Sequence, residues 1–141
     1  MTPLDLRIAP PRPPRATAAG VIFLPRSIDK ARASLPGGDL GEYTIEGLTQ
    51  GMLEKFGIEI PAFTAAVERA RDDDDVAAFV SERTTQATID EWNAHILQRL
   101  SRGGNRAEAL VAHPWLVTRP DLTLSVDVLE EDDRQSFSER R

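Results

Sequence analysis

Short runs of apolar residues at helical spacing, each bounded by glycine or proline, constrain the fold of this chain more than any other feature. Leu48, Met52 and Phe56 form one such run, which Gly57 follows, and Pro61 precedes the next. Apolar residues that recur every three or four positions lie on one side of a helix. Glycine commonly ends a helix, and proline is tolerated in its first turn. The pattern therefore predicts a mainly α-helical, compact single domain of five to seven short helices.

Four further helices are expected from the same pattern. They are the segment from Arg26 or Ser27 to Leu35, ended by Pro36-Gly37-Gly38; a helix behind Pro61 with Phe63, Val67 and Ala70; a helix that follows Asp72–Asp75 and carries Val76, Phe79 and Val80; and the longest, residues 88–102. Acidic residues favour the positive N-terminal end of a helix. The four aspartates are therefore predicted to cap a helix, since they lack the alternating spacing, glycine and distal glutamate of a calcium loop.

The C-terminal region gives a different pattern. Leu122, Leu124, Val126 and Val128 alternate with polar residues, which is the period of a half-buried strand. A strand needs a partner, and three alternatives remain open: a hairpin with residues 21–24, an edge supplied by another chain, or a helical turn that ends at residues 130–133. The expected organisation is an N-terminal arm (1–20), a helical domain (21–130) and a charged, frayed tail (131–141).

The proline-rich opening cannot be helical. Proline lacks a backbone donor and restricts the residue before it to extended conformations, and four prolines occur between residues 10 and 14. We expect an extended arm that packs Leu4, Leu6 and Ile8 onto the core. The alternative is a proline-rich ligand for an aromatic groove on another protein.

Charge is distributed unevenly along the chain. Residues 1–35 hold six Lys and Arg residues and two acidic residues, which gives this segment a net charge of +4. Because the net charge of the whole chain is −6, the other residues together carry −10. Such asymmetry suggests where something anionic could dock, while the acidic total disfavours duplex nucleic acid. The absence of cysteine excludes disulfides and thiolate metal sites, and no metal or cofactor is expected.

A leader peptide and a membrane span are both disfavoured. Arg12 and Arg15 precede an apolar run at residues 16–24, but Thr17 interrupts it and Pro25 closes it without a convincing cleavage site. No stretch approaches the ~20 apolar residues that span a bilayer. The sequence thus favours a cytoplasmic protein.

Three functions remain in competition. The preferred one is a non-catalytic binding module that holds an anionic small molecule or an acidic partner surface. The second is a small enzyme with Asp29 as base, Tyr43 as acid and Arg26 or Lys30 stabilising negative charge. The third is a helical scaffold that forms homo-oligomers. The candidate ligand-binding residues are Arg12, Arg15, Arg26, Asp29, Lys30, Arg32 and Tyr43.

Neither histidine is expected to be catalytic. His95 follows Glu91 by one helical turn, but a single such pair supplies neither enough metal ligands nor a nucleophile. His113 precedes Pro114-Trp115, where a helix is expected to end.

The chain also resembles a known family. The motifs that carry the resemblance are Pro11-Arg12-x-Pro14-Arg15, Gly20, Leu24-Pro25-Arg26, Asp29-Lys30-x-Arg32-Ala33, the glycine loop that leads to Tyr43, and Gly57. Together they resemble the uncharacterised bacterial domain-of-unknown-function 5069 family, most closely through Trp92. The resemblance implies a small, single-domain bacterial protein with no assigned activity, and it directs attention to the candidate residues named above.

Overall fold

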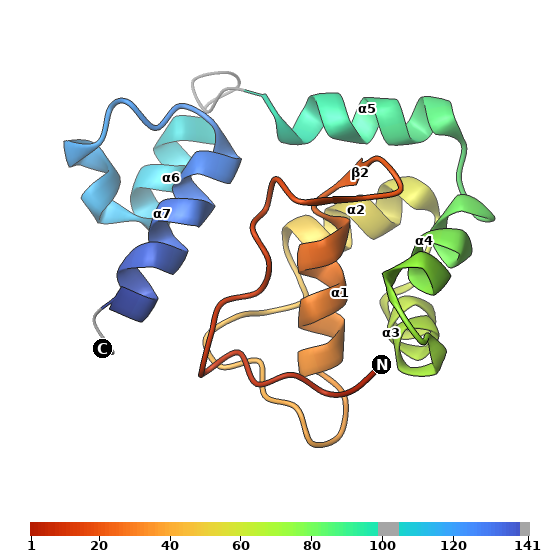
Figure 1. Cartoon of the computed structure of the whole chain (residues 1–141). Helices are drawn as coiled ribbons and strands as arrows, with labels where there is room; N and C mark the ends of the chain where they lie inside the picture. The colour runs from red at the N-terminus through yellow and green to blue at the C-terminus, as the bar shows by residue number, and fades with distance from the viewer. Residues whose placement is uncertain (99–104, 139–141) are drawn as a thin grey trace. The chain divides into compact units, whose positions relative to one another are not determined.

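The computed structural model describes residues 1–98 and 105–138, and these residues form a mainly α-helical fold, as predicted (Figure 1). The described elements are β1 (Thr17–Ala18), β2 (Val21–Ile22), α1 (Leu24–Ala33), α2 (Leu48–Phe56), α3 (Ile60–Arg69), α4 (Asp73–Ser81), α5 (Gln86–Ile96), α6 (Asn105–Ala112), the 3-10 helix η1 (Pro114–Thr118) and α7 (Ser125–Ser138). The chain divides into two units, residues 1–93 and 94–141. None of the described helices is long and apolar enough to cross a membrane.

Helix α1 occupies the core of the first unit. It packs against α3, α4 and β1, and nine of its ten residues are buried. It begins at Leu24, two residues earlier than the sequence suggests, with Pro25 in its first turn. A proline there costs nothing, because the first-turn donors have no partner within the helix.

The other helices of this unit begin and end where local chemistry predicts. Gly57 ends α2 with φ of 72°, a left-handed conformation that glycine adopts readily. Pro61 lies in the first turn of α3. Asp72 caps α4, since its carboxylate accepts a hydrogen bond of 3.1 Å from the main-chain nitrogen of Asp75. These features confirm the predicted capping.

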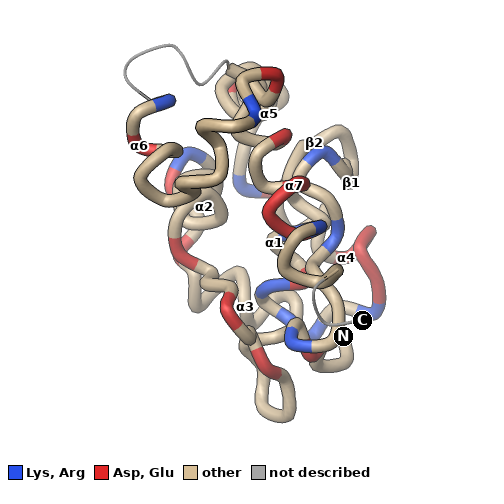
Figure 2. Tube along the Cα trace, turned by 90° about the vertical axis from the view of Figure 1, so that its left-hand side faces the viewer, with Lys and Arg blue, Asp and Glu red and all other residues tan. Residues whose placement is uncertain are grey.

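The N-terminal segment is only partly packed onto the core. Leu6 is buried, whereas Ile8 is 78% exposed, so the prediction that Ile8 packs inward is wrong. Leu6 donates from its main-chain nitrogen to Asp39, and Ile8 then donates back to Asp5. This turn directs Ile8 outward. Figure 2 shows basic and acidic positions interspersed along the chain, and two basic residues of this segment form ion pairs: Arg7 with Asp5 at 2.8 Å and Arg12 with Asp29 at 3.1 Å.

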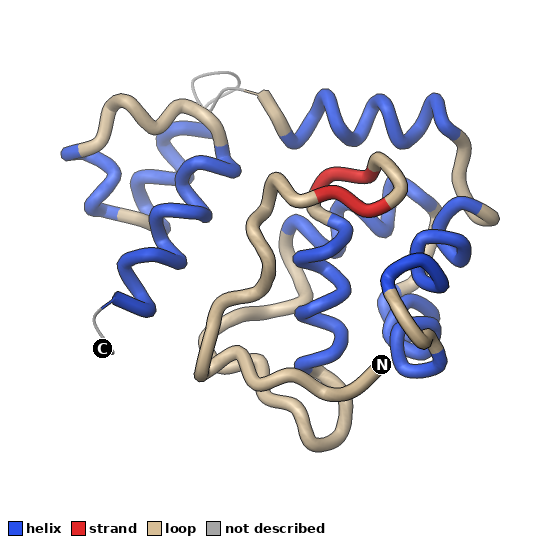
Figure 3. The backbone as a smooth tube through the Cα atoms, in the orientation of Figure 1, coloured by secondary structure: helices blue, strands red, loops and turns tan. Residues whose placement is uncertain are grey.

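A short hairpin precedes α1 (Figure 3). Its antiparallel register pairs Thr17 with Ile22 and Ala18 with Val21. Asn93 of α5 serves as a third partner: its Oδ1 accepts from the main-chain nitrogen of Ile22 at 3.0 Å, and its Nδ2 donates to the carbonyl of Gly20 at 2.8 Å. The indole of Trp92 also donates to the carbonyl of Ile22 at 2.8 Å. The hairpin therefore depends on α5 as well as on its own strands.

The second unit contains a small cluster in which Leu116 and Val128 are buried; Ala109, Leu110, Trp115 and Leu122 pack against it. Of the three alternatives for residues 122–128, the helical one agrees with the structure, because α7 begins at Ser125. The helix continues to Ser138, so the predicted end at residues 130–133 is wrong. Asp127 accepts from the main-chain nitrogen of Leu124 at 3.3 Å, the reciprocal bond of a capping box. This cap and the long polar run behind it favour the helix.

The predicted helix 88–102 is shorter in the part that the structure describes. Helix α5 covers Gln86–Ile96, and residues 99–102 of the prediction lie outside the described residues. Among the described helices the longest is α7, with 14 residues.

Candidate functional site

Two cationic side chains of α1 share the faces of two aromatic rings. The Arg26 guanidinium lies 5.9 Å from the Phe23 ring centroid and 5.6 Å from that of Tyr43. The Lys30 ammonium lies 5.6 Å from the Phe23 centroid and 6.0 Å from that of Tyr43. All four distances are within the range of cation–π attraction. We call these four residues the Arg26–Lys30 cluster.

The helix itself places the two cations together. Arg26 and Lys30 are four residues apart in α1, so both lie on the same face, one turn from each other. Only 2% of Arg26 and 8% of Lys30 is exposed. These two charges of α1 are therefore not presented to solvent. The two positive charges thus lie together where little water screens them.

Phe23 has an unusual backbone conformation. It precedes the first residue of α1 with φ of 79°, in the left-handed region, and its side chain is completely buried. This region costs an ordinary residue about 1–2 kcal/mol. Hydrogen bonds from Phe23 to the carbonyl of Ala16 and from Ser27 to the carbonyl of Phe23 hold the backbone there. Strained residues of this kind are concentrated at functional sites.

Arg12 joins the N-terminal segment to two helices. Its main-chain nitrogen donates to Oδ2 of Asp29 at 2.8 Å, and its Nη2 donates to Oδ1 of Asp29 at 3.1 Å. Its Nη1 and Nη2 also donate to Asp73 of α4, at 2.5 and 3.1 Å. These bonds hold the pKa of Asp73 below its ordinary value of 3.8 and raise the pKa of Arg12. The guanidinium of Arg12 therefore forms ion pairs with two carboxylates.

The remaining candidates are more dispersed. Arg15 is exposed. Arg32 donates from Nε to the carbonyl of Thr2 at 2.8 Å and from Nη2 to its hydroxyl at 2.9 Å. Arg32 also borders a hollow of about 420 Å³, whose lining includes Arg12, Arg32, Arg71, Asp72, Asp73 and Asp74. Three arginines and three aspartates of the described residues therefore line the same hollow.

Each histidine lies near an acidic residue, Glu91 or Asp132. Glu91, one turn before His95, forms an ion pair with Lys55 at 3.0 Å. Nδ1 of His113 lies 3.4 Å from Oδ1 of Asp132, and its ring centroid lies 5.7 Å from that of Trp115. Within the described residues, no group of three or more His, Cys, Asp or Glu side chains could hold a metal ion.

A family model described as a domain of unknown function (DUF5069) matches residues 8–135. The chain belongs to the DUF5069 family. The match extends over both units. It includes every residue of the Arg26–Lys30 cluster, as well as Arg12 and the two aspartates that Arg12 contacts. No curated protein matches the chain.

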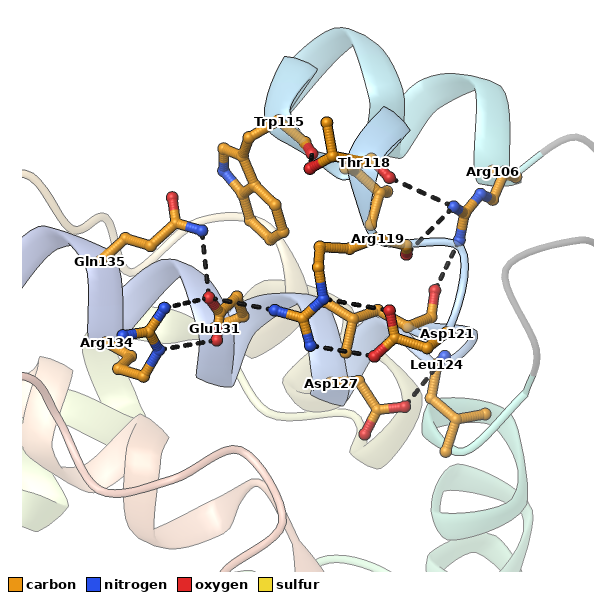
Figure 4. Close-up of polar contacts among 12 residues, drawn as sticks. Arg106, Trp115, Thr118, Arg119, Asp121, Leu124, Asp127, Glu131, Arg134 and Gln135 are labelled. Carbon is orange, nitrogen blue, oxygen red and sulfur yellow. Dashed lines mark hydrogen bonds and ion pairs between the residues drawn. The ribbon is translucent and has the colours of Figure 1, made fainter.

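The second unit of this DUF5069 chain contains a separate polar network (Figure 4). Glu131 accepts from Arg134 at 2.5 and 2.9 Å and from Gln135 at 3.1 Å, and it lies 3.3 Å from Arg119. Hydrogen bonding from Arg134, with further contributions from Gln135 and Arg119, lowers the pKa of Glu131 from 4.5 to about 2. Arg106 donates to the carbonyl of Leu122 at 2.5 Å. The network ties η1, the following loop and α7 together, which is a structural function.

Sequence reasoning missed two residues of this DUF5069 chain that matter to the site. Phe23 precedes Arg26 by three positions and Lys30 by seven, the helical spacing that could have placed its ring beside both cations. For Asp73, the sequence indicates only a contribution to a helix cap. No local signal connects Asp73 to Arg12, 61 positions earlier.

Proposed function

We propose that this protein is a non-catalytic binding module that holds the carboxylate or phosphate group of a small molecule at the Arg26–Lys30 cluster. The observation that carries the proposal is the placement of two buried cations over the same two rings. A planar guanidinium suits bidentate contact with a carboxylate or phosphate, and an ammonium adds a compact point charge. The family resemblance and ordinary composition further support a bacterial, cytoplasmic protein.

The burial of the cluster favours a small anion over an acidic protein surface. A flat partner surface makes its contacts with exposed side chains, whereas Arg26 and Lys30 are almost entirely covered. A small anion gains more from each cation in such surroundings, because little water competes for it. Binding to an acidic partner surface is therefore the weaker proposal.

The enzyme alternative receives less support from the contacts. It requires Asp29 as a general base with an oxygen directed at substrate. Both oxygens of Asp29 instead accept hydrogen bonds from Arg12. This arrangement supports a structural function for Asp29 more than that of a general base.

The test compares two variants that each remove one positive charge from beside an aromatic ring. Lys30→Gln alters the cluster, and Arg83→Gln is the matched control, because the Arg83 guanidinium lies 3.7 Å from the centroid of the half-buried Phe79 ring. Inorganic phosphate, pyrophosphate, succinate and citrate are screened by thermal shift and calorimetry. A probe at about 100 times its dissociation constant should stabilise the wild type by about 2.7 kcal/mol.

We expect Lys30→Gln to weaken binding of the probe at least tenfold, and Arg83→Gln to leave it within twofold of wild type. Equal loss in both variants would show that only general charge matters. Absence of binding by the wild type to any of the four probes would overturn the proposal.

A further inference from the structure

Arg12 contacts the proposed site through its main chain. Nη1 of Arg26 donates to the carbonyl oxygen of Arg12 at 3.3 Å. That carbonyl therefore helps to set the direction in which the Arg26 guanidinium lies over the rings of Phe23 and Tyr43. Arg12 thus acts on the cluster while its own charge is directed elsewhere.

The residues on both sides of Arg12 restrict the position of its carbonyl group. Pro11 precedes Arg12 and Pro13 follows it, so the local backbone has little freedom. Pro11 and Pro14 are also buried. The remaining freedom is removed by the bonds of Arg12 to Asp29, which come from both its main chain and its side chain.

Asp73 completes this attachment from another helix. It lies in the first turn of α4 and accepts two hydrogen bonds from the Arg12 guanidinium, at 2.5 and 3.1 Å. Two parallel bonds between a guanidinium and a carboxylate fix orientation as well as distance. Asp73 therefore restricts how the Arg12 side chain is rotated.

We propose that Arg12 and Asp73 are positioning residues for the anion site: the Asp73 carboxylate fixes Arg12, and the Arg12 carbonyl then orients Arg26. The inference rests on the proposed function and deepens it, because it makes anion affinity depend on a carboxylate outside the cluster. If charge alone mattered, removing the negative charge of Asp73 would favour anion binding. The positioning function predicts the opposite result, namely that loss of this carboxylate weakens anion binding.

The test uses Asp73→Asn, with Asp74→Asn as the matched control. Asp74 is the next residue of the same helix turn and is exposed, so its replacement changes the charge equally. The probe is whichever of phosphate, pyrophosphate, succinate or citrate the wild type binds. Affinity is measured by calorimetry, and the Nε–H resonance of Arg26 is followed by NMR, after assignment with an Arg26→Lys variant.

We expect Asp73→Asn to weaken probe binding about fivefold or more and to shift the Arg26 resonance. Asp73→Glu should restore most of the affinity, and Asp74→Asn should change neither readout. Arg12→Lys is a second variant: it keeps the positive charge and the carbonyl but cannot bind both carboxylates in the same geometry. It should also move the Arg26 resonance.

The outcomes separate the two proposals. If the wild type binds a probe and Asp73→Asn or Arg12→Lys leaves both affinity and the Arg26 resonance unchanged, the positioning inference is overturned while the binding function stands. If the wild type binds none of the probes, the binding function is overturned, and the inference falls with it.

Discussion

At the scale of single residues, Phe23 combines a positive φ with a completely buried ring. Its φ is 79°, and its ring lies beside both cations of the cluster. The ring stabilises the fold through burial, while the backbone conformation opposes it. Comparing two substitutions that both remove the ring separates these contributions.

We expect Phe23→Ala to lower the free energy of unfolding by about 3–5 kcal/mol, as for other buried aromatic residues. Phe23→Gly should be about 1 kcal/mol more stable than Phe23→Ala, because glycine adopts positive φ without the penalty that alanine incurs. Urea denaturation measures both. Ala78→Gly, in an exposed part of α4, is the control and should show the opposite preference, with glycine less stable by about 1 kcal/mol. A Phe23→Gly variant no more stable than Phe23→Ala would contradict the strain argument.

Sequence reasoning identified the charged residues but not their surroundings. The motifs directed attention to Arg26, Lys30 and Tyr43, which the structure does bring together. Burial of charge was not predictable, because charged residues are mostly exposed and only long-range contacts reveal the exceptions. Asp29 shows this: its carboxylate is buried, and its partner Arg12 also contacts Asp73 of a different helix.

At the scale of elements, the hairpin before α1 is too short to be stable alone. Two strands of two residues make few hydrogen bonds, and isolated hairpins are at best marginal in water. Asn93 adds one accepted and one donated bond from α5. The hairpin in turn leads directly into Phe23, so α5 helps to hold the start of α1.

Asn93→Ala should lower the free energy of unfolding by about 1–3 kcal/mol, because it leaves the partly buried main-chain nitrogen of Ile22 without its acceptor. Gln86→Ala is the control on the same helix: Gln86 is exposed, and its side chain donates to Asp90, so we expect a change within about 0.5 kcal/mol. Urea denaturation distinguishes them. Equal effects of the two changes would show that Asn93 contributes no more than an exposed side chain.

Elements were predictable where the signal is local. Gly57, Pro61 and Asp72 end or begin helices through their own backbone or side-chain chemistry, and the structure agrees at each. The alternation at residues 122–128 left a strand and a helical turn both open, because four apolar residues fit either. The capping bond of Asp127, together with the helical run behind it, decides in favour of α7.

At the scale of the whole molecule, several carboxylates are bound to arginines within their own unit. Hydrogen bonding from Arg12 lowers the pKa of Asp73 in the first unit, and hydrogen bonding from Arg134 lowers the pKa of Glu131 to about 2 in the second. A carboxylate with a lower pKa when folded binds more protons when unfolded. Its stabilising effect is therefore complete above the unfolded pKa and is lost as pH falls through the folded value.

The two tryptophans allow this loss to be assigned to a unit. Trp92 lies in the first unit and Trp115 in the second, so Trp92→Phe leaves a reporter of the second unit and Trp115→Phe a reporter of the first. In the Trp92→Phe background, Glu131→Gln should lower stability at pH 7. The difference in stability between this double variant and its Trp92→Phe parent should vanish as pH falls from about 4.5 towards 2.

Urea unfolding followed by fluorescence at pH 7, 5, 4, 3 and 2 measures this dependence. Glu108→Gln, exposed on α6 in the same unit, is the matched control and should leave the pH profile unchanged. Because Arg119, Arg134 and Gln135 all belong to the second unit, the Trp115→Phe background should show a smaller change than the Trp92→Phe background. A destabilising effect of Glu131→Gln that persisted at pH 2 would mean that the packing and hydrogen bonding of the native side chain, rather than its charge, provide the stabilisation.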